Sequence, residues 1–117
     1  MQSQQLLELV THTLDERKGE RVTALDVKSK TTITDYMVVA TGTSSRHLNA
    51  LADYVRESVK AQGVQPWGQE GGVSAEWVLL DLGDVIVHLF TEQAREFYQL
   101  EKLWSVEREA VDSVEVS

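Results

Sequence analysis

The chain has 117 residues, a length typical of one domain, and a hydrophobic fraction of 42%, enough for a single folded core. Its 19 acidic and 11 basic residues give a formal net charge of −8, which disfavours a protein that holds nucleic-acid phosphates by itself and favours a basic partner. The absence of cysteine excludes disulfides, thiol nucleophiles and thiolate metal sites, and three scattered histidines argue against a closed zinc site. We therefore expect no metal and no cofactor.

The start of the chain, "MQSQQLLELV", lacks the basic region followed by an apolar stretch that a secretory signal needs. The longest apolar runs are far shorter than a membrane span. We therefore expect a soluble, cytoplasmic protein without membrane contacts.

Helical and strand patterns alternate in the first part of the chain. A first helix is predicted over residues 3–18, where four apolar residues lie at helical spacing: Leu6, Leu7, Val10 and Leu14. The polar stretch "DERKGE" ends this helix. Residues 22–27 alternate in the manner of a strand, and residues 35–42, "DYMVVATG", form a nearly continuous apolar run, which is typical of a strand covered on both faces.

A second amphipathic helix is predicted next, with apolar positions at Leu48, Leu51, Ala52, Val55 and Val59. A hydroxyl group from Thr43, Ser44 or Ser45 is expected to cap its start. Gly63 is expected to end it, and Pro66 forbids its continuation. A short strand near residues 64–69 and a flexible turn at residues 70–76 follow.

Residues 76–90, "EWVLLDLGDVIVHLF", predict a β-hairpin. Gly83 and Asp84 are the expected two-residue turn, because glycine at the first central position suits a type II′ geometry. In that register six aliphatic residues share one side and are expected to build the core: Val78, Leu80, Leu82, Val85, Val87 and Leu89. On the other side the facing pairs are Trp77 with Phe90, Leu79 with His88, and Asp81 with Ile86.

This second side of the hairpin admits two interpretations. In the first, the terminal segment covers it, and Asp81 and His88, which lie diagonally close enough for their side chains to approach, satisfy each other beneath the cover. In the second, the side is partly exposed and forms a docking surface with aromatic anchors. We favour the second, because burying a carboxylate and an imidazole costs free energy unless each finds partners, and the segment after residue 93 is short.

The charges around the hairpin indicate what such a surface binds. Between Ala61 and Ala94 there is no Lys or Arg, whereas five acids lie there: Glu70, Glu76, Asp81, Asp84 and Glu92. A solvated acidic surface is the simpler interpretation, but as part of a docking surface these acids select a partner that carries Lys or Arg.

The order of the elements predicts an α/β fold with a mixed five-stranded sheet flanked by helices. The helix after the strand at residues 35–42 predicts a right-handed parallel crossover, and the two long helices are expected to cover at least one face. The segment "REFYQLEKLW", residues 95–104, is expected to be helical or irregular. We expect a single domain over residues 1–105 and an acidic, flexible tail over residues 106–117.

Phosphate-transfer chemistry has only weak support. "TGTSS", residues 41–45, lies between a strand and a helix, where hydroxyls and backbone amides can hold a phosphate, but a helix cap is the commoner use. A nucleotidyltransferase also needs two carboxylates on a following strand to hold magnesium. No Asp-x-Asp occurs anywhere in the chain.

Hydrolytic chemistry also has only weak support in the sequence. Asp81 with His88 resembles an acid-oriented base, but the hairpin has no Ser or Cys as the nucleophile, and Ser44 or Ser45 would have to come from another loop. The remaining candidates, His12, Arg46 and His47, are expected to be solvated. We therefore assign no catalytic residue and expect no enzyme.

Three stretches resemble one family: "TDYMVVATGTSSRH", "EWVLLDLGDVIVHLF" and "REFYQLEKLW". In this order they closely resemble the Iojap family of ribosomal silencing factors, called RsfS in bacteria. The likeness runs over about residues 3–105 and leaves only the acidic tail outside. It implies a fold similar to that of nucleotidyltransferases, without the catalytic carboxylates, and a role that is not enzymatic.

The resemblance also implies a partner, the large ribosomal subunit, bound through large-subunit ribosomal protein fourteen, a basic protein on the intersubunit side. The bound factor would sterically prevent the small subunit from joining and so repress translation when nutrients are scarce. Organellar relatives assist large-subunit assembly, so assembly without silencing is the alternative. We expect at most minor contact with ribosomal RNA, because an acidic protein repels phosphates.

The family's motif, carried over onto this sequence, places the partner-binding surface on the second side of the hairpin at Trp77, Leu79, Asp81, His88 and Phe90, with Arg95, Glu96 and Tyr98 at its rim. The same apolar surface motivates a further hypothesis. The free protein would cover it by forming a homodimer and release it to the ribosome.

Overall fold

The computed structural model describes residues 1–98 of the chain. Its elements follow the predicted order: α1 (Ser3–Glu16), β1 (Glu20–Asp26), β2 (Tyr36–Gly42), α2 (Ser45–Ala61), β3 (Gly68–Glu70), β4 (Trp77–Asp81), β5 (Val85–Thr91) and α3 (Glu92–Tyr98). The end of the predicted last segment and the acidic tail lie outside the described residues. None of the helices in the described part is long and apolar enough to cross a membrane.

The five strands form one sheet in the order β1-β2-β5-β4-β3. β2 and β5 are parallel, and the other neighbouring strands are antiparallel, so the predicted mixed sheet is confirmed. β3 runs in the same direction as β2, as expected of a crossover through α2, although β5 and β4 lie between the two. The predicted likeness to nucleotidyltransferases stays a prediction.

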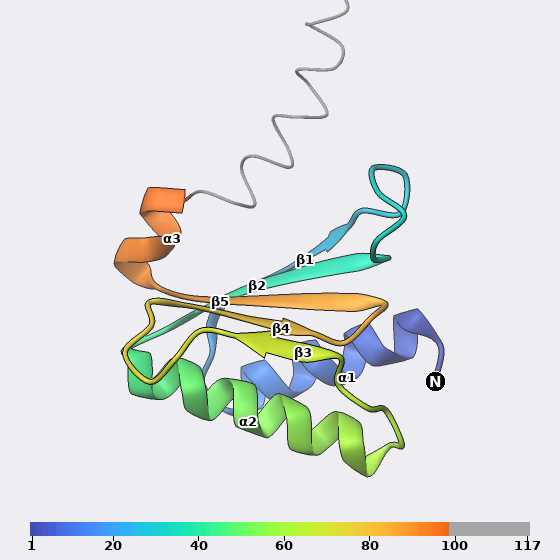
Figure 1. The fold of residues 1–117 in the computed structure, drawn as a ribbon, viewed down its shortest axis with the longest axis horizontal. Helices are drawn as coiled ribbons and strands as arrows, with labels where there is room; N and C mark the ends of the chain where they lie inside the picture. The colour runs from blue at the N-terminus through green and yellow to red at the C-terminus, as the bar shows by residue number, and fades with distance from the viewer. Residues whose placement is uncertain (99–117) are drawn as a thin grey trace, which may run out of the picture.

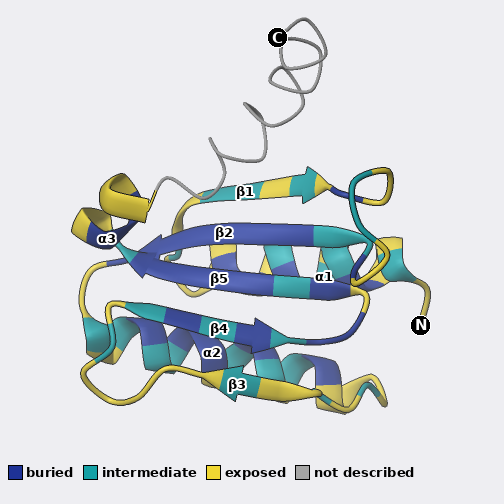
Figure 2. Ribbon diagram, turned by 45° about the horizontal axis from the view of Figure 1, so that its top comes forward, coloured by how far each residue is buried: buried dark blue, intermediate teal, exposed yellow. Residues whose placement is uncertain are grey.

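The two long helices lie side by side on the same face of the sheet (Figure 1). On the opposite face, which we call the free face, the described chain places one helix, α3, at the end where β2 and β5 finish (Figure 2). The two long helices therefore layer one side of the sheet, whereas no helix of residues 1–98 crosses the middle of the other side (Figures 1 and 2).

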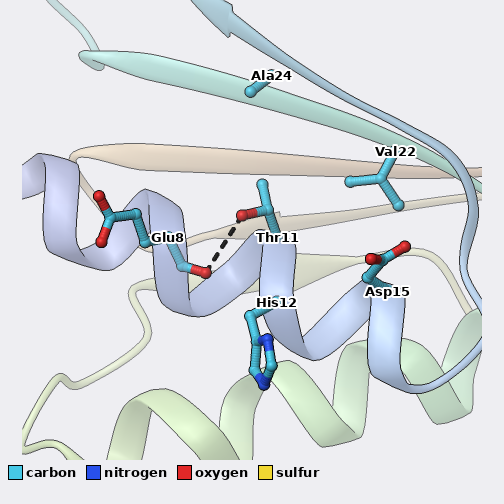
Figure 3. A pocket seen from close by; sticks show the side chains of 6 residues that line it. All are labelled: Glu8, Thr11, His12, Asp15, Val22 and Ala24. Carbon is cyan, nitrogen blue, oxygen red and sulfur yellow. Dashed lines mark hydrogen bonds between the residues drawn. The ribbon is translucent and has the colours of Figure 1, made fainter.

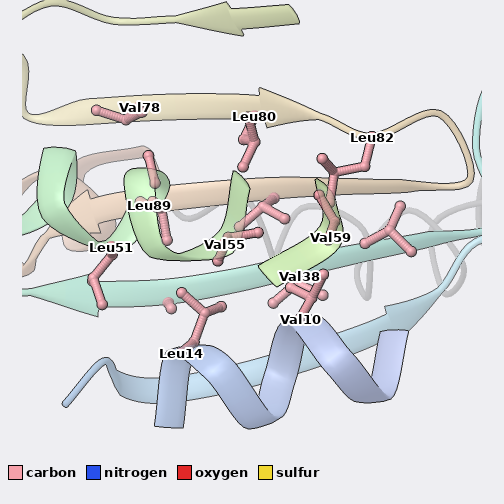
Figure 4. Close-up of a cluster of buried hydrophobic side chains, with 14 of the residues drawn as sticks. Val10, Leu14, Val38, Leu51, Val55, Val59, Val78, Leu80, Leu82 and Leu89 are labelled. Atoms are coloured by element: carbon pink, nitrogen blue, oxygen red, sulfur yellow. The ribbon is translucent and has the colours of Figure 1, made fainter. Parts of the chain in front are cut away.

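The core fills the space between the sheet and these two helices (Figure 4). α1 contributes Leu6, Val10 and Leu14, and the apolar stripe predicted for α2 is buried in full. Each fully buried Leu or Val stabilises the fold by roughly 1.5 to 3 kcal/mol relative to an exposed one. β2 lies between two strands and is buried along almost all of its length, which explains its continuous apolar run.

The helix ends agree with the residues that predicted them. Ser44 caps α2, since its Oγ accepts a hydrogen bond from the backbone N–H of His47 at 3.1 Å. Gly63 takes a φ of 82° just after the end of α2, a conformation that favours glycine. α1 ends at Glu16, two residues earlier than predicted, because the chain turns through a positive φ of 69° at Lys18.

Candidate protein interface

The hairpin β4–β5 has the predicted turn and register. Gly83 has a φ of 87°, whereas Asp84 is not among the residues of positive φ, as a type II′ turn requires. The N–H of Leu82 donates to the carbonyl of Val85 at 2.9 Å. All six residues predicted for the core side belong to the main hydrophobic cluster: Val78, Leu80, Leu82, Val85, Val87 and Leu89.

The side of the hairpin on the free face is only partly exposed. The side chains at one end and along the middle are half-buried: Trp77, Leu79, Asp81 and Ile86. Those of His88 and Phe90 are buried, with exposed fractions of 5% and 0%. The prediction of a partly exposed surface therefore holds for four residues, and for His88 and Phe90 it is wrong.

A second hydrophobic cluster buries Phe90. It forms on the free face from Val27, which directly follows β1, and from Met37 and Val39 of β2, together with Phe90 and Ala94. Because Ala94 belongs to α3, this short helix covers the end of the sheet where Phe90 lies (Figure 2). The first interpretation, a terminal cover, therefore applies to this end of the sheet.

Asp81 and His88 do not pair. Oδ1 of Asp81 accepts a hydrogen bond from the backbone N–H of Gly83 at 2.8 Å, and Nδ1 of His88 accepts one from Nε1 of Trp77 at 3.0 Å. The carboxylate is thus used to hold the hairpin turn. The predicted approach of the two side chains is therefore wrong, and the alternative in which Asp81 orients His88 as a base has no support.

Burial lowers the pKa of the His88 imidazole from its ordinary 6.5 to about 4. The ring is therefore neutral at pH 7, which allows it to be buried without a carboxylate beside it. Its hydrogen bond with Trp77 satisfies the nitrogen Nδ1.

Aromatic rings gather where α3 meets the hairpin. The ring centroid of Trp77 lies 5.0 Å from that of Phe90 and 4.6 Å from that of Tyr98. Phe97 meets Tyr98 edge to face at 5.0 Å, and the side chains of Phe97 and Tyr98 are 79% and 47% exposed. A surface hollow of about 480 Å³ lies between these rings, lined by Ala75, Glu76, Trp77, Gln93, Ala94, Phe97 and Tyr98. Phe97 was missed from the sequence, although it lies in the quoted motif beside Tyr98.

Arg95 lies inside the structure and not at the rim. Its side chain is 3% exposed. The guanidinium donates to the carbonyl of Arg21 at 2.7 Å and to the hydroxyls of Thr41 at 2.9 Å and Thr23 at 3.1 Å. The register of β1 shifts at this point, and Arg21 has a φ of 50°, so the strand turns a carbonyl out of the sheet and the guanidinium satisfies it.

The predicted place of Glu96 at the rim of a binding surface stays a prediction. Glu96 is exposed and lies 3.6 Å from the guanidinium of Arg21. Together with Arg95 it links α3 to β1, and this link orients the helix that carries Phe97 and Tyr98 over Trp77.

The loop before α2 uses its polar groups for a helix cap, the commoner of the two uses considered for it. The hydroxyl of Ser44 caps α2, and the backbone N–H of Thr43 donates to Nδ1 of His47 at 3.0 Å, so the loop uses these groups within itself. His47 is half-buried and not solvated, since Nε2 also lies 3.3 Å from the carbonyl of Arg17.

A second hollow, of about 420 Å³, lies between α1 and β1 (Figure 3). Its lining consists of Glu8, Thr11, His12, Asp15, Val22 and Ala24. The side chains of Glu8, His12 and Asp15 point in different directions, and His12 is exposed as expected. No group of three or more His, Asp and Glu residues within residues 1–98 is arranged to hold a metal ion.

Comparisons with known proteins agree with this description. A family model described as ribosomal silencing factor during starvation matches residues 1–117. The ribosomal silencing factor RsfS of Haemophilus influenzae is 46% identical over 100 residues, which cover 86% of this chain and 98% of that protein. A crystal structure of a protein from Chromobacterium violaceum matches with a TM-score of 0.87 and 40% identity over 90% of this chain and 88% of that one.

A more distant relative is from mouse. It is named mitochondrial assembly of ribosomal large subunit protein 1, and it is 30% identical over 103 residues, which cover 86% of this chain and 45% of that protein.

The fold and the site define a small α/β domain whose mixed sheet has one face packed by helices and one face that carries an aromatic cluster. The chain belongs to the family of ribosomal silencing factors, RsfS. The predicted resemblance is confirmed, and the family's role is in translation regulation.

Proposed function

We propose that this protein binds the large ribosomal subunit through large-subunit ribosomal protein fourteen and sterically blocks joining of the small subunit, so that translation falls when nutrients are limited. The observation that carries the proposal is the free face of the sheet. Two long helices cover the other face, and in the described residues this one carries half-buried and exposed aromatic side chains with no helix across its middle.

The charge around the free face supports a basic protein as the partner. Residues 62–93 contain no Lys or Arg, and the acids Glu70, Glu76 and Asp84 on or beside the hairpin are exposed. Such a surface attracts Lys and Arg side chains and repels the phosphates of ribosomal RNA, so protein contacts would dominate the affinity.

Exposure indicates which residues of the predicted surface would supply most of the contact area with the partner. Those with accessible side chains are Trp77, Leu79, Asp81, Glu96 and Tyr98, and Phe97 joins them. Phe90 and Arg95 would act from below, Phe90 by supporting the ring of Trp77 and Arg95 by holding α3 in place.

The test is co-sedimentation with purified large subunits, comparing wild type with Trp77→Ala. We expect loss of most of the binding, because a central aromatic side chain often contributes 2 kcal/mol or more, a roughly thirtyfold effect. Tyr54→Ala is the matched control, since Tyr54 is a half-buried aromatic residue of α2, which packs on the other face of the sheet. Undiminished binding by folded Trp77→Ala would remove this face from the interface, and no binding by wild type would overturn the proposal.

The second candidate is a large-subunit assembly factor that does not block joining, which the name of the mouse relative favours. A subunit-joining assay separates the two functions. Silencing requires that added protein lowers the yield of joined ribosomes in proportion to its occupancy of large subunits. Full joining at saturating occupancy would leave assembly as the function.

A homodimer of the free protein is a further proposal, supported by the apolar area that the aromatic cluster leaves exposed. Its test is sedimentation equilibrium of the wild type and Phe97→Ser, with an expected shift of the variant towards the monomer. A monomeric wild type at high micromolar concentration would end this idea.

A further inference from the structure

The hydrogen bond between Trp77 and His88 determines which imidazole nitrogen carries the proton. The indole Nε1–H is only a donor, so Nδ1 of His88, at 3.0 Å, is the acceptor. An imidazolium would present N–H groups at both nitrogens, and neither could accept this bond. His88 is therefore the neutral tautomer with its proton on Nε2.

That proton has no acceptor in the part of the chain that the structure describes. There Trp77 gives the imidazole of His88 its one hydrogen bond, and no buried side-chain nitrogen or oxygen in residues 1–98 is left without a partner. Nε2 is consequently not fully buried, although the residue as a whole is 5% exposed. The ring is also held in place, because it lies parallel to Phe90, with an interplanar angle of 10°.

The position of this donor in the sheet would allow it to discriminate between partners. His88 lies between Val39 of β2 and Leu79 of β4, with its side chain on the free face. A partner that covers the face removes water from the Nε2–H. A buried donor left unpaired costs about 1 to 3 kcal/mol, so a partner with no acceptor at this point binds more weakly.

The surrounding charges limit the kind of acceptor. Acids outnumber bases on and around the hairpin, and neither β5, which carries His88, nor its two neighbouring strands β2 and β4 contain Lys or Arg. A carboxylate or phosphate brought to this face would be repelled. A neutral oxygen meets no such penalty.

We propose that His88 is a specificity-determining residue, whose Nε2–H donates a hydrogen bond to a neutral carbonyl oxygen that projects from the partner protein. The proposal rests on the proposed function, because it specifies the chemistry of the same docking face. Trp77 then has two roles, as an aromatic contact and as the group that sets the tautomer.

The first measurement is the tautomer itself, by nitrogen-15 NMR of the labelled full chain at pH 7. We expect a protonated Nε2 and an unprotonated Nδ1 at His88. A proton on Nδ1 would overturn the proposal, and this result needs no variant that must fold.

The second measurement is the affinity of wild type, His88→Gln and His88→Asn for purified large subunits. The amide nitrogen of Gln reaches the place of Nε2, whereas the Asn side chain reaches only the place of Nδ1. We expect His88→Gln to bind within about threefold of wild type and His88→Asn to lose about tenfold, the value of one hydrogen bond. Equal binding of all three, with Trp77→Ala still defective, would overturn the role of His88 alone. Wild-type binding that Trp77→Ala does not weaken would instead overturn the proposed docking face, and with it this inference.

Discussion

The two sides of the hairpin β4–β5 differ in what their residues do, although they alternate within the same fifteen residues. On the covered side every residue is aliphatic and at most 3% exposed. On the free side aromatic, polar and charged residues are mixed, and four of six are half-buried. One strand pair thus supplies stability on one side, while the other side stays accessible to a partner.

Among the variants that test the difference between the two sides, Leu80→Ala is expected to have the largest effect on stability. This side chain is fully buried between the sheet and the helices, so we expect a loss of about 2 to 5 kcal/mol in the free energy of unfolding. Leu79→Ala, one residue away on the half-buried side, should lose less than about 1.5 kcal/mol, with weaker binding to large subunits. Chemical denaturation measures both, and equal losses would contradict the assignment of the two sides.

The buried imidazole of the free side makes stability depend on pH. The pKa of His88 is lowered in the folded state from 6.5 to about 4, so the unfolded chain binds the proton more tightly. The stabilisation from the neutral ring is complete above pH 6.5 and is lost as the pH falls to about 4, a change of about 3 kcal/mol.

The difference between wild type and His88→Gln isolates this effect from the carboxylates that titrate in the same range. We expect the difference in the free energy of unfolding to shrink steadily from pH 6.5 to pH 4. A difference that does not depend on pH would show that His88 is not buried in neutral form.

The position of α3 on the free side depends on Arg95. We expect Arg95→Met to lower the free energy of unfolding by about 1 to 3 kcal/mol, because the carbonyl of Arg21 and the hydroxyl of Thr41 lose a buried donor. Glu96→Ala is the control on the same helix, with an exposed ion pair whose removal costs about 0.5 kcal/mol or less. Thermal unfolding compares them, and similar midpoints would refute the buried role of Arg95.

The smallest effect is expected at the start of α2, on the covered side. Ser44→Ala removes the helix cap and should cost about 1 kcal/mol, with unchanged affinity for large subunits. Thr32→Ala, in an exposed loop, is the comparison. A loss of subunit binding by folded Ser44→Ala would mean that the interface extends beyond the free face.

The sequence allowed the hairpin to be predicted with its turn and register, because both depend on neighbours in the chain. Alternation assigns each residue of the two strands to a side, and Gly83 sets the turn that aligns them. The cap at Ser44 and the two long helices are equally local. The family motif, which extends over three such segments, pointed to the correct family.

The use of individual polar residues could not be predicted in this way. The carboxylate of Asp81 accepts a hydrogen bond from the turn residue Gly83, and the imidazole of His88 accepts one from Trp77. The diagonal spacing of Asp81 and His88 had allowed the two side chains to pair with each other instead. Arg95 lies in a charged stretch of α3, but its acceptors are in β1 and β2, more than fifty residues earlier in the chain. No local pattern predicts a carbonyl exposed by an irregular strand so far away.

By itself, then, the sequence determined the order of the elements, the two sides of the hairpin and the family, since periodicity, turn residues and long motifs act within short segments. Only the tertiary structure decided which face of the sheet stays free, how α3 covers Phe90, and which nitrogen of His88 carries the proton. These features depend on contacts between distant segments, and their free energy is set by burial and by the partners that each polar group finds there.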